Sequence, residues 1–139
     1  MGNCQTGEVR LQGGPNVREG RVEICINNAW GTVCNNLFGV DDAIVTCTQM
    51  NFSSEGIAYI SHCDYMLRVS LNVGARVVRD ASLPGLSGTP IFLSGLRCNS
   101  DIHTNILDCE ALDHGITRCL HDEDVVVHCE GEEVCSYEL

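Results

Sequence analysis

Hydrophobic and polar residues alternate between residues 20 and 34. Val22, Ile24 and Ile26 recur at every second position, which is the period of a strand that buries one face. A pair of asparagines, typical of a tight turn, interrupts the pattern before the run Trp30 to Val33. The pattern predicts a β-hairpin with strands at residues 21–27 and 30–35. Similar runs predict further strands at residues 8–12, 89–93 and 125–129.

A helical period follows the hairpin. Between residues 41 and 50 the apolar side chains recur three or four positions apart. Asp41 and Asp42 stand at the start of this run, where the helix dipole favours negative charge. The sequence therefore predicts one main helix, and a second short helix is expected around residues 105–110.

The segment from Ser53 to Gly88 contains two strand-like runs, at residues 65–72 and 75–80, which predict an extra hairpin. Arg68, Arg76 and Arg79 supply three of the eight basic residues of the chain here. One interpretation is that this segment binds a ligand of its own, since loops on rigid scaffolds often carry function. The other is that it is a tolerated loop, because added length costs little entropy.

Ten cysteines in 139 residues indicate a disulfide framework and an oxidising, extracellular compartment. No C-x₂-C pair of the kind found in zinc modules is present. The number of conceivable pairings is too large for the spacing alone to select one.

The net charge of −11, from 19 acidic and 8 basic residues, argues against nucleic acid as a partner. The acidic residues either keep the domain soluble or, in part, collect divalent cations. No apolar run is long enough to span a membrane, so no membrane insertion is expected. Met1 is not followed by a signal-peptide pattern, so we expect a mature segment of a secreted protein or receptor.

Several motifs, in order, resemble the scavenger receptor cysteine-rich family. They are Gly20-Arg-Val-Glu-Ile24, Trp30-Gly-Thr-Val-Cys34, the helical run 41–50 and Val125-Val-Val-His-Cys129. The resemblance covers roughly residues 8–130 and implies an α+β fold. In that fold a curved, mostly antiparallel sheet cradles one main helix. We therefore expect a single domain over residues 1–139, with a core at 8–130 and an insertion at 53–88.

The resemblance also implies disulfides Cys34–Cys119, Cys47–Cys129 and Cys98–Cys109. Four further cysteines lie outside the family pattern. For these we predict Cys4–Cys135, which would tie the termini together, and Cys25–Cys63, which would anchor the insertion.

Family members that bind ligands through calcium or magnesium carry two aspartates after the WGTVC cysteine and a glutamate near the last strand. The matching positions here are Asn35, Asn36 and Glu123, and Asp41 and Asp42 could add carboxylates. Exchanging two aspartates for asparagines removes two charged ligands of the kind that hard cations prefer. A calcium or magnesium site is accordingly an expectation that rests on the resemblance.

No catalytic motif is found, so we expect no enzyme activity. The resemblance implies an extracellular recognition module, and two kinds of ligand remain open. One is an anionic microbial, glycan or lipid ligand held through a cation, as in innate immunity. The other is a specific protein partner that contacts the 53–88 insertion. A structural role within a larger secreted protein is a third hypothesis.

The sequence Asn51-Phe-Ser53 is a predicted glycosylation site.

Overall fold

The computed structural model describes residues 4–50, 75–79, 82–86, 88–114 and 118–129. These residues form a seven-stranded sheet, one α-helix and two short 3-10 turns. The elements are β1 (Val9–Asn16), β2 (Glu19–Ile26), β3 (Ala29–Val33), α1 (Val40–Gln49), β4 (Ala75–Val77), β5 (Ile91–Ser94), η1 (Ile106–Asp108), β6 (Asp113–His114), η2 (His121–Glu123) and β7 (Val126–Cys129). The main helix and the strands predicted at residues 8–12, 21–27, 30–35, 75–80, 89–93 and 125–129 are present with shifted ends. The second predicted helix is the single turn η1.

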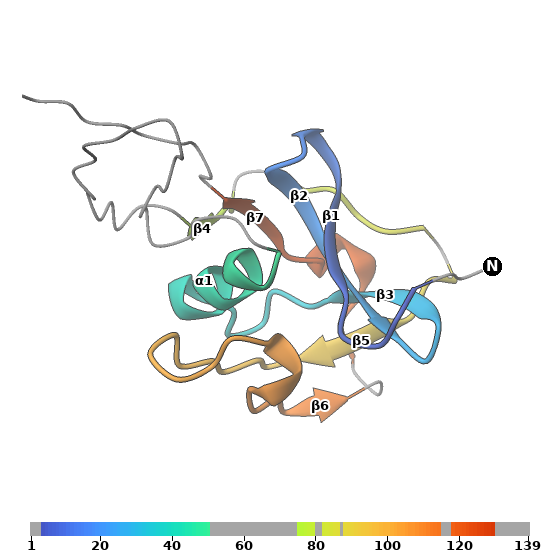
Figure 1. Ribbon diagram of the computed structural model, residues 1–139. Helices are drawn as coiled ribbons and strands as arrows, with labels where there is room; N and C mark the ends of the chain where they lie inside the picture. Colours follow the sequence, from blue (N-terminus) through green and yellow to red (C-terminus); the bar gives the residue numbers. More distant parts are fainter. Residues whose placement is uncertain (1–3, 51–74, 80–81, 87, 115–117, 130–139) are drawn as a thin grey trace, which may run out of the picture.

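The strands follow the order β4-β7-β2-β3-β5-β6, and β1 pairs with β2. Every pairing is antiparallel except that of β3 with β5. The sheet curls, and α1 packs against β4 and β7 with η1 near its end (Figure 1). This arrangement confirms the predicted α+β, mostly antiparallel fold.

The β2–β3 hairpin is built as its sequence predicts. Asn27 and Asn28 adopt φ angles of 53° and 69°, the left-handed region that asparagine tolerates and that two-residue hairpin turns require. Val22, Ile24 and Val33 are completely buried in the core. The residues that alternate with them, among them Arg21, Glu23 and Thr32, therefore lie on the opposite, outer face of the sheet.

Three of the predicted disulfides are confirmed, Cys34–Cys119, Cys47–Cys129 and Cys98–Cys109. Two of them join residues 85 and 82 positions apart. Cys47–Cys129 fastens α1 to β7 inside the core, where both residues are fully buried.

The predicted pairs Cys4–Cys135 and Cys25–Cys63 are wrong, because Cys4 is bonded to Cys25. The reason is the antiparallel pairing of β1 with β2, which brings the chain before β1 alongside the end of β2. Gly7 N donates to Cys25 O at 2.8 Å, and the Cα atoms of the two cysteines are 6.0 Å apart. Cys63 and Cys135 lie outside the described residues.

The predicted extra hairpin is described only in its second run. Its second run, residues 75–80, begins with β4, which pairs antiparallel with β7 and so belongs to the main sheet. The first run, residues 65–72, lies outside the described residues.

Residues 82–86 and 88–90, here called the outer strap, cross the outer face of the sheet. Thr32 N donates to Pro90 O at 2.9 Å at one end of the strap. Arg21 Nη1 donates to Leu83 O at 2.9 Å and to Pro84 O at 3.2 Å at the other. The strap is therefore fixed structure and not a free loop.

Candidate functional site

The three positions of the expected cation site come together at the end of β3. Asn35 N donates to Glu123 O at 2.7 Å, and Cys34–Cys119 joins the same two segments covalently. Asn35, Asn36 and Glu123 are all exposed. The structure thus brings the predicted positions to one place on the surface.

The chemistry of these side chains fits a hard cation poorly. Only Glu123 supplies a carboxylate, and its Oε1 already accepts the N–H of Leu120 at 2.9 Å, which caps the turn η2. Calcium sites usually combine several charged oxygen ligands. Among the described residues the one compact group of candidate ligands is Cys34, Cys119 and Glu123, and its two sulfurs are joined in a disulfide.

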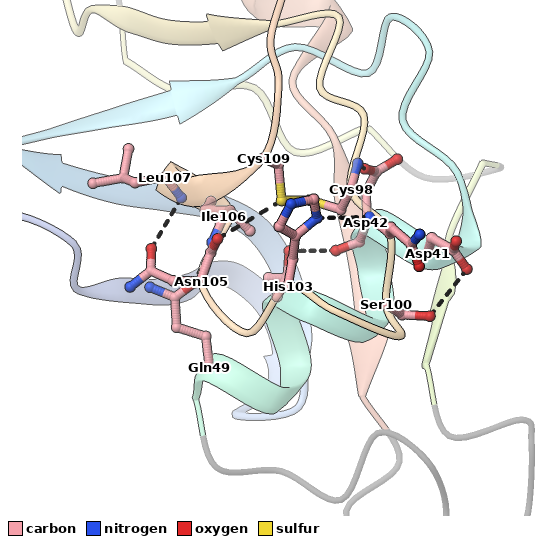
Figure 2. The surroundings of a disulfide bond; sticks show 12 residues. Asp41, Asp42, Gln49, Cys98, Ser100, His103, Asn105, Ile106, Leu107 and Cys109 are labelled. Carbon is pink, nitrogen blue, oxygen red and sulfur yellow. Dashed lines mark hydrogen bonds between the residues drawn. A yellow bond between two sulfur atoms is a disulfide. The ribbon is translucent and has the colours of Figure 1, made fainter.

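Asp42 is a structural residue and does not join the cation positions. Its Oδ2 accepts Gly39 N at 2.8 Å and its Oδ1 accepts Cys98 N at 2.6 Å (Figure 2). Burial raises the pKa of Asp42 above 3.8, although these two N–H groups oppose that effect. Asp42 therefore fastens the start of α1 to the Cys98 loop.

Asp41 is exposed and accepts a hydrogen bond from Ser100 Oγ at 3.2 Å (Figure 2). This contact directs one carboxylate oxygen toward the 99–103 loop. The proposed contribution of Asp41 to a cation site has no support in these contacts.

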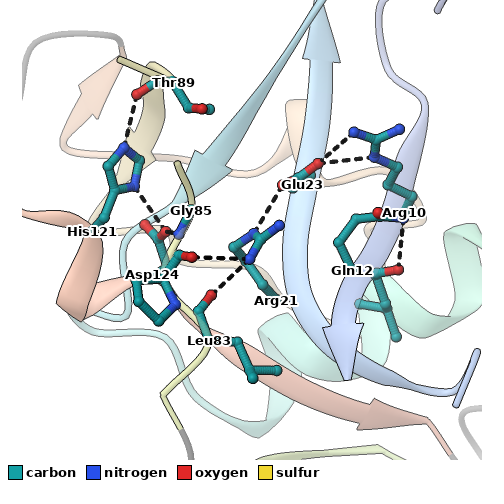
Figure 3. A network of polar contacts seen from close by, with 11 residues as sticks. Arg10, Gln12, Arg21, Glu23, Leu83, Gly85, Thr89, His121 and Asp124 are labelled. Atoms are coloured by element: carbon teal, nitrogen blue, oxygen red, sulfur yellow. Dashed lines mark hydrogen bonds and ion pairs between the residues drawn. The ribbon is translucent and has the colours of Figure 1, made fainter. Parts of the chain in front are cut away.

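A buried polar cluster that the sequence did not single out lies behind these positions. Asp124 Oδ2 accepts Gly85 N at 2.8 Å and lies 2.8 Å from Nδ1 of His121 (Figure 3). The other ring nitrogen of His121, Nε2, lies 2.8 Å from Thr89 O. His121, in η2, and Asp124, directly after it, thus hold the outer strap at two points.

The ring of His121 faces an acceptor on each side, a carboxylate and a carbonyl. Both nitrogens must carry protons to donate to both, so the geometry matches the charged imidazolium. Burial lowers the pKa of His121, and the positive charge of Arg21 lowers it further. The contacts with Asp124 and Thr89 outweigh both effects and raise this pKa above 6.5.

This geometry predicts a loss of stability on the alkaline side. A raised folded-state pKa means that the contribution of His121 is complete below its unfolded pKa and disappears as pH rises through the folded value. We expect the free energy of unfolding to fall over that range, and His121→Gln to remove this part of the dependence. Urea denaturation at a series of pH values measures it.

His103→Gln is the matched control. His103 Nδ1 accepts a hydrogen bond from Asn99 N within its own loop, not from the outer strap. An unchanged pH profile in His121→Gln would contradict the assignment.

The two described arginines of the predicted ligand patch make different contacts. Arg76 stands opposite His128 in the β4–β7 pairing and is exposed. Arg79 Nη2 donates to Phe38 O at 2.9 Å, so this guanidinium lies against the loop after β3. Arg68 and the sequon residue Asn51 lie outside the described residues.

A second network occupies the outer face beside the strap. Glu23 is buried and accepts Arg10 Nε and Arg21 Nε, each at 2.8 Å (Figure 3). The guanidinium of Arg10 also lies 4.0 Å from the ring centre of Trp30. These contacts satisfy the buried carboxylate and explain why Glu23 faces away from the core.

In the described part of the chain no helix is long and apolar enough to cross a membrane.

Comparison with known proteins agrees with this fold. The family model of the scavenger receptor cysteine-rich domain matches residues 12–130. Lysyl oxidase homolog 4 of Homo sapiens is 36% identical over 121 residues, which make up 87% of this chain and 13% of that protein. A scavenger receptor cysteine-rich domain superfamily protein of Patiria pectinifera is 33% identical over 126 residues, or 91% of this chain and 9% of that protein. The chain thus spans a small part of these relatives.

Two solved structures are similar over most of their length. The third such domain of murine neurotrypsin has a TM-score of 0.65 and 28% identity, covering 91% of this chain and 98% of that one. The dimeric form of the domain of mouse MARCO has a TM-score of 0.58 and 29% identity, covering 87% of this chain and 93% of that one.

Proposed function

Because the chain belongs to the scavenger receptor cysteine-rich domain family, whose members are extracellular modules of receptors and secreted proteins, we propose that it recognises a protein ligand without a divalent cation. The family is non-catalytic. The similarity to lysyl oxidase homologues covers this domain only, so the oxidase activity in their name is not transferred.

One observation carries the proposal: a single carboxylate, Glu123, stands among the three cation positions, and one of its oxygens caps η2. Asn35 and Asn36 bring oxygen atoms without charge, which weakens the attraction for calcium or magnesium. The net charge of −11 also opposes the approach of anionic polymers. A protein surface needs neither a bound cation nor a basic face on this domain.

Restoring the missing charges is expected to create a calcium site. In the double variant Asn35→Asp, Asn36→Asp, three carboxylates would converge, and we expect saturable binding at about 1 mM calcium, a value common for extracellular modules. The unmodified domain should give no saturable heat at that concentration. Isothermal titration calorimetry of the chelator-treated domain measures both.

Adding Glu123→Ala to the double variant should abolish the new calcium binding. Saturable binding by the unmodified domain, lost in Glu123→Ala alone, would contradict the proposal.

That outcome would support the second candidate, cation-dependent binding of an anionic microbial, glycan or lipid ligand. The hydrogen bond from Asn35 N to Glu123 O favours this candidate, because it draws the three positions together. Heparin and phosphatidylserine vesicles are suitable probes, each tested in calcium and in EDTA. We expect neither to bind at physiological salt. A purely structural role in a larger protein would leave every probe unbound, and saturable binding of a peptide ligand would contradict it.

A further inference from the structure

A pocket of about 320 Å³ opens beside β4, at the edge of the candidate site. Val77 and Val126 contribute to its apolar wall, and the antiparallel pairing of β4 with β7 holds these two strands together. Asn35, Arg79, Ser82 and Asp122 bring polar groups to the same pocket. Its volume lies at the lower end of the range for ligand sites, which suits one or two side chains.

Arg79 has unused hydrogen-bonding capacity at this pocket. Among the described residues its guanidinium has one hydrogen-bond partner, Phe38 O, which accepts from Nη2. A guanidinium carries five N–H donors in one plane, so the remaining donors are free to meet a planar acceptor. A carboxylate matches that fork with two parallel hydrogen bonds. The contact with Phe38 holds the fork in place before any ligand arrives.

The lining of the pocket also includes acidic residues. Asp122 is exposed on η2, whereas Asp124 is buried and its Oδ2 already contacts His121 and Gly85. A purely anionic ligand would meet Asp122 and the net charge of −11, and a purely cationic one would meet Arg79. A ligand with both charges side by side is complementary to a lining that contains both Arg79 and Asp122.

We propose that this pocket binds an acidic and a basic side chain that lie next to each other on a protein partner. The acidic group pairs with the Arg79 guanidinium, the basic group lies toward Asp122, and the aliphatic stems rest on Val77. This inference rests on the proposed function and specifies the part of the partner that the domain reads.

The test is an NMR titration of the ¹⁵N-labelled domain, in EDTA, with the blocked dipeptide N-acetyl-Glu-Lys-amide. The Glu-Ala and Ala-Lys dipeptides are the single-charge comparisons. We expect saturable shifts at the amides of Val77, Val78 and Ser82, and affinity about tenfold higher for the mixed-charge peptide, since a charge-assisted pair adds to each end. Arg79→Gln should abolish the shifts, and Asp122→Asn should remove the preference for Glu-Lys over Glu-Ala.

Arg97→Gln is the matched control. Arg97 is exposed, its backbone pairs with that of Glu110, and it does not line the pocket. If Arg79→Gln does not fold, Arg79→Lys keeps the charge without the planar fork and should weaken binding about tenfold. Shifts that persist in Arg79→Gln, or none with the unmodified domain, would overturn the inference. EDTA keeps this result separate from the calcium test, so the pocket can fail while the calcium-free proposal stands.

Discussion

Removal of the Cys47–Cys129 disulfide by double alanine substitution is expected to lower the free energy of unfolding by about 3.5 kcal/mol. While Cys34–Cys119 stays closed, this bond closes a loop that runs 13 positions from Cys34 to Cys47 and 10 positions from Cys119 to Cys129, and its absence gives the unfolded chain more conformational freedom. The loss is large beside the 5–15 kcal/mol that typically stabilises a domain, so the variant should unfold at much lower denaturant. Denaturation in guanidinium chloride under oxidising conditions gives the value.

The double variant Cys98→Ala, Cys109→Ala provides the comparison. Its bond spans only 11 residues, for which the same chain-entropy argument gives about 3 kcal/mol. The order of the two losses is therefore the informative quantity. An equal or larger loss on removing the short bond would mean that local packing, and not loop length, sets the contribution of these disulfides.

Asp124→Ala is the second change with a large expected effect. It removes the acceptor for the Gly85 N–H and the partner of the His121 ring, and it leaves both without their partner at a largely buried site. Breaking a buried charged pair in this way typically costs about 3 kcal/mol. The midpoint of urea denaturation should fall, and hydrogen exchange of the Gly85 amide should accelerate with it.

Two further variants separate the causes. Asp124→Asn keeps an oxygen for the Gly85 N–H but loses the charge that faces His121, so its loss should be smaller. Asp122→Ala changes an exposed neighbour in the same turn and should stay within about 0.5 kcal/mol. Equal losses in Asp122→Ala and Asp124→Ala would show that the turn itself, and not the buried contact, matters.

The strands of this domain were open to prediction because each carries its own signal. The alternation around Val22 and Ile24 indicates which face of the strand is buried, and Asn27 and Asn28 indicate where the chain turns. The pairing of Cys4 with Cys25 had no such local signal. It depends on the register of β1 on β2, which is set by the whole sheet.

The candidate site was predicted at the level of position but not of role. Asp41 and Asp42 look equivalent in the sequence, yet one is exposed and the other is buried and bonded to two N–H groups. His121 resembles an ordinary loop residue until Thr89, 32 positions away, is placed against its ring. Contacts of this kind depend on packing between distant segments, which no spacing along the chain reports.

The disulfide connectivity also determines how the domain would carry a pulling force. When tension is applied at Cys4 and Cys129, the covalent path runs through Cys4–Cys25, along the chain to Cys34, across to Cys119 and on to Cys129. Fully extended, the two chain segments on that path span about 70 Å, against roughly 440 Å for the same chain without cross-links. The domain would therefore act as a short, nearly inextensible link, with most of its residues held in closed loops that bear no load.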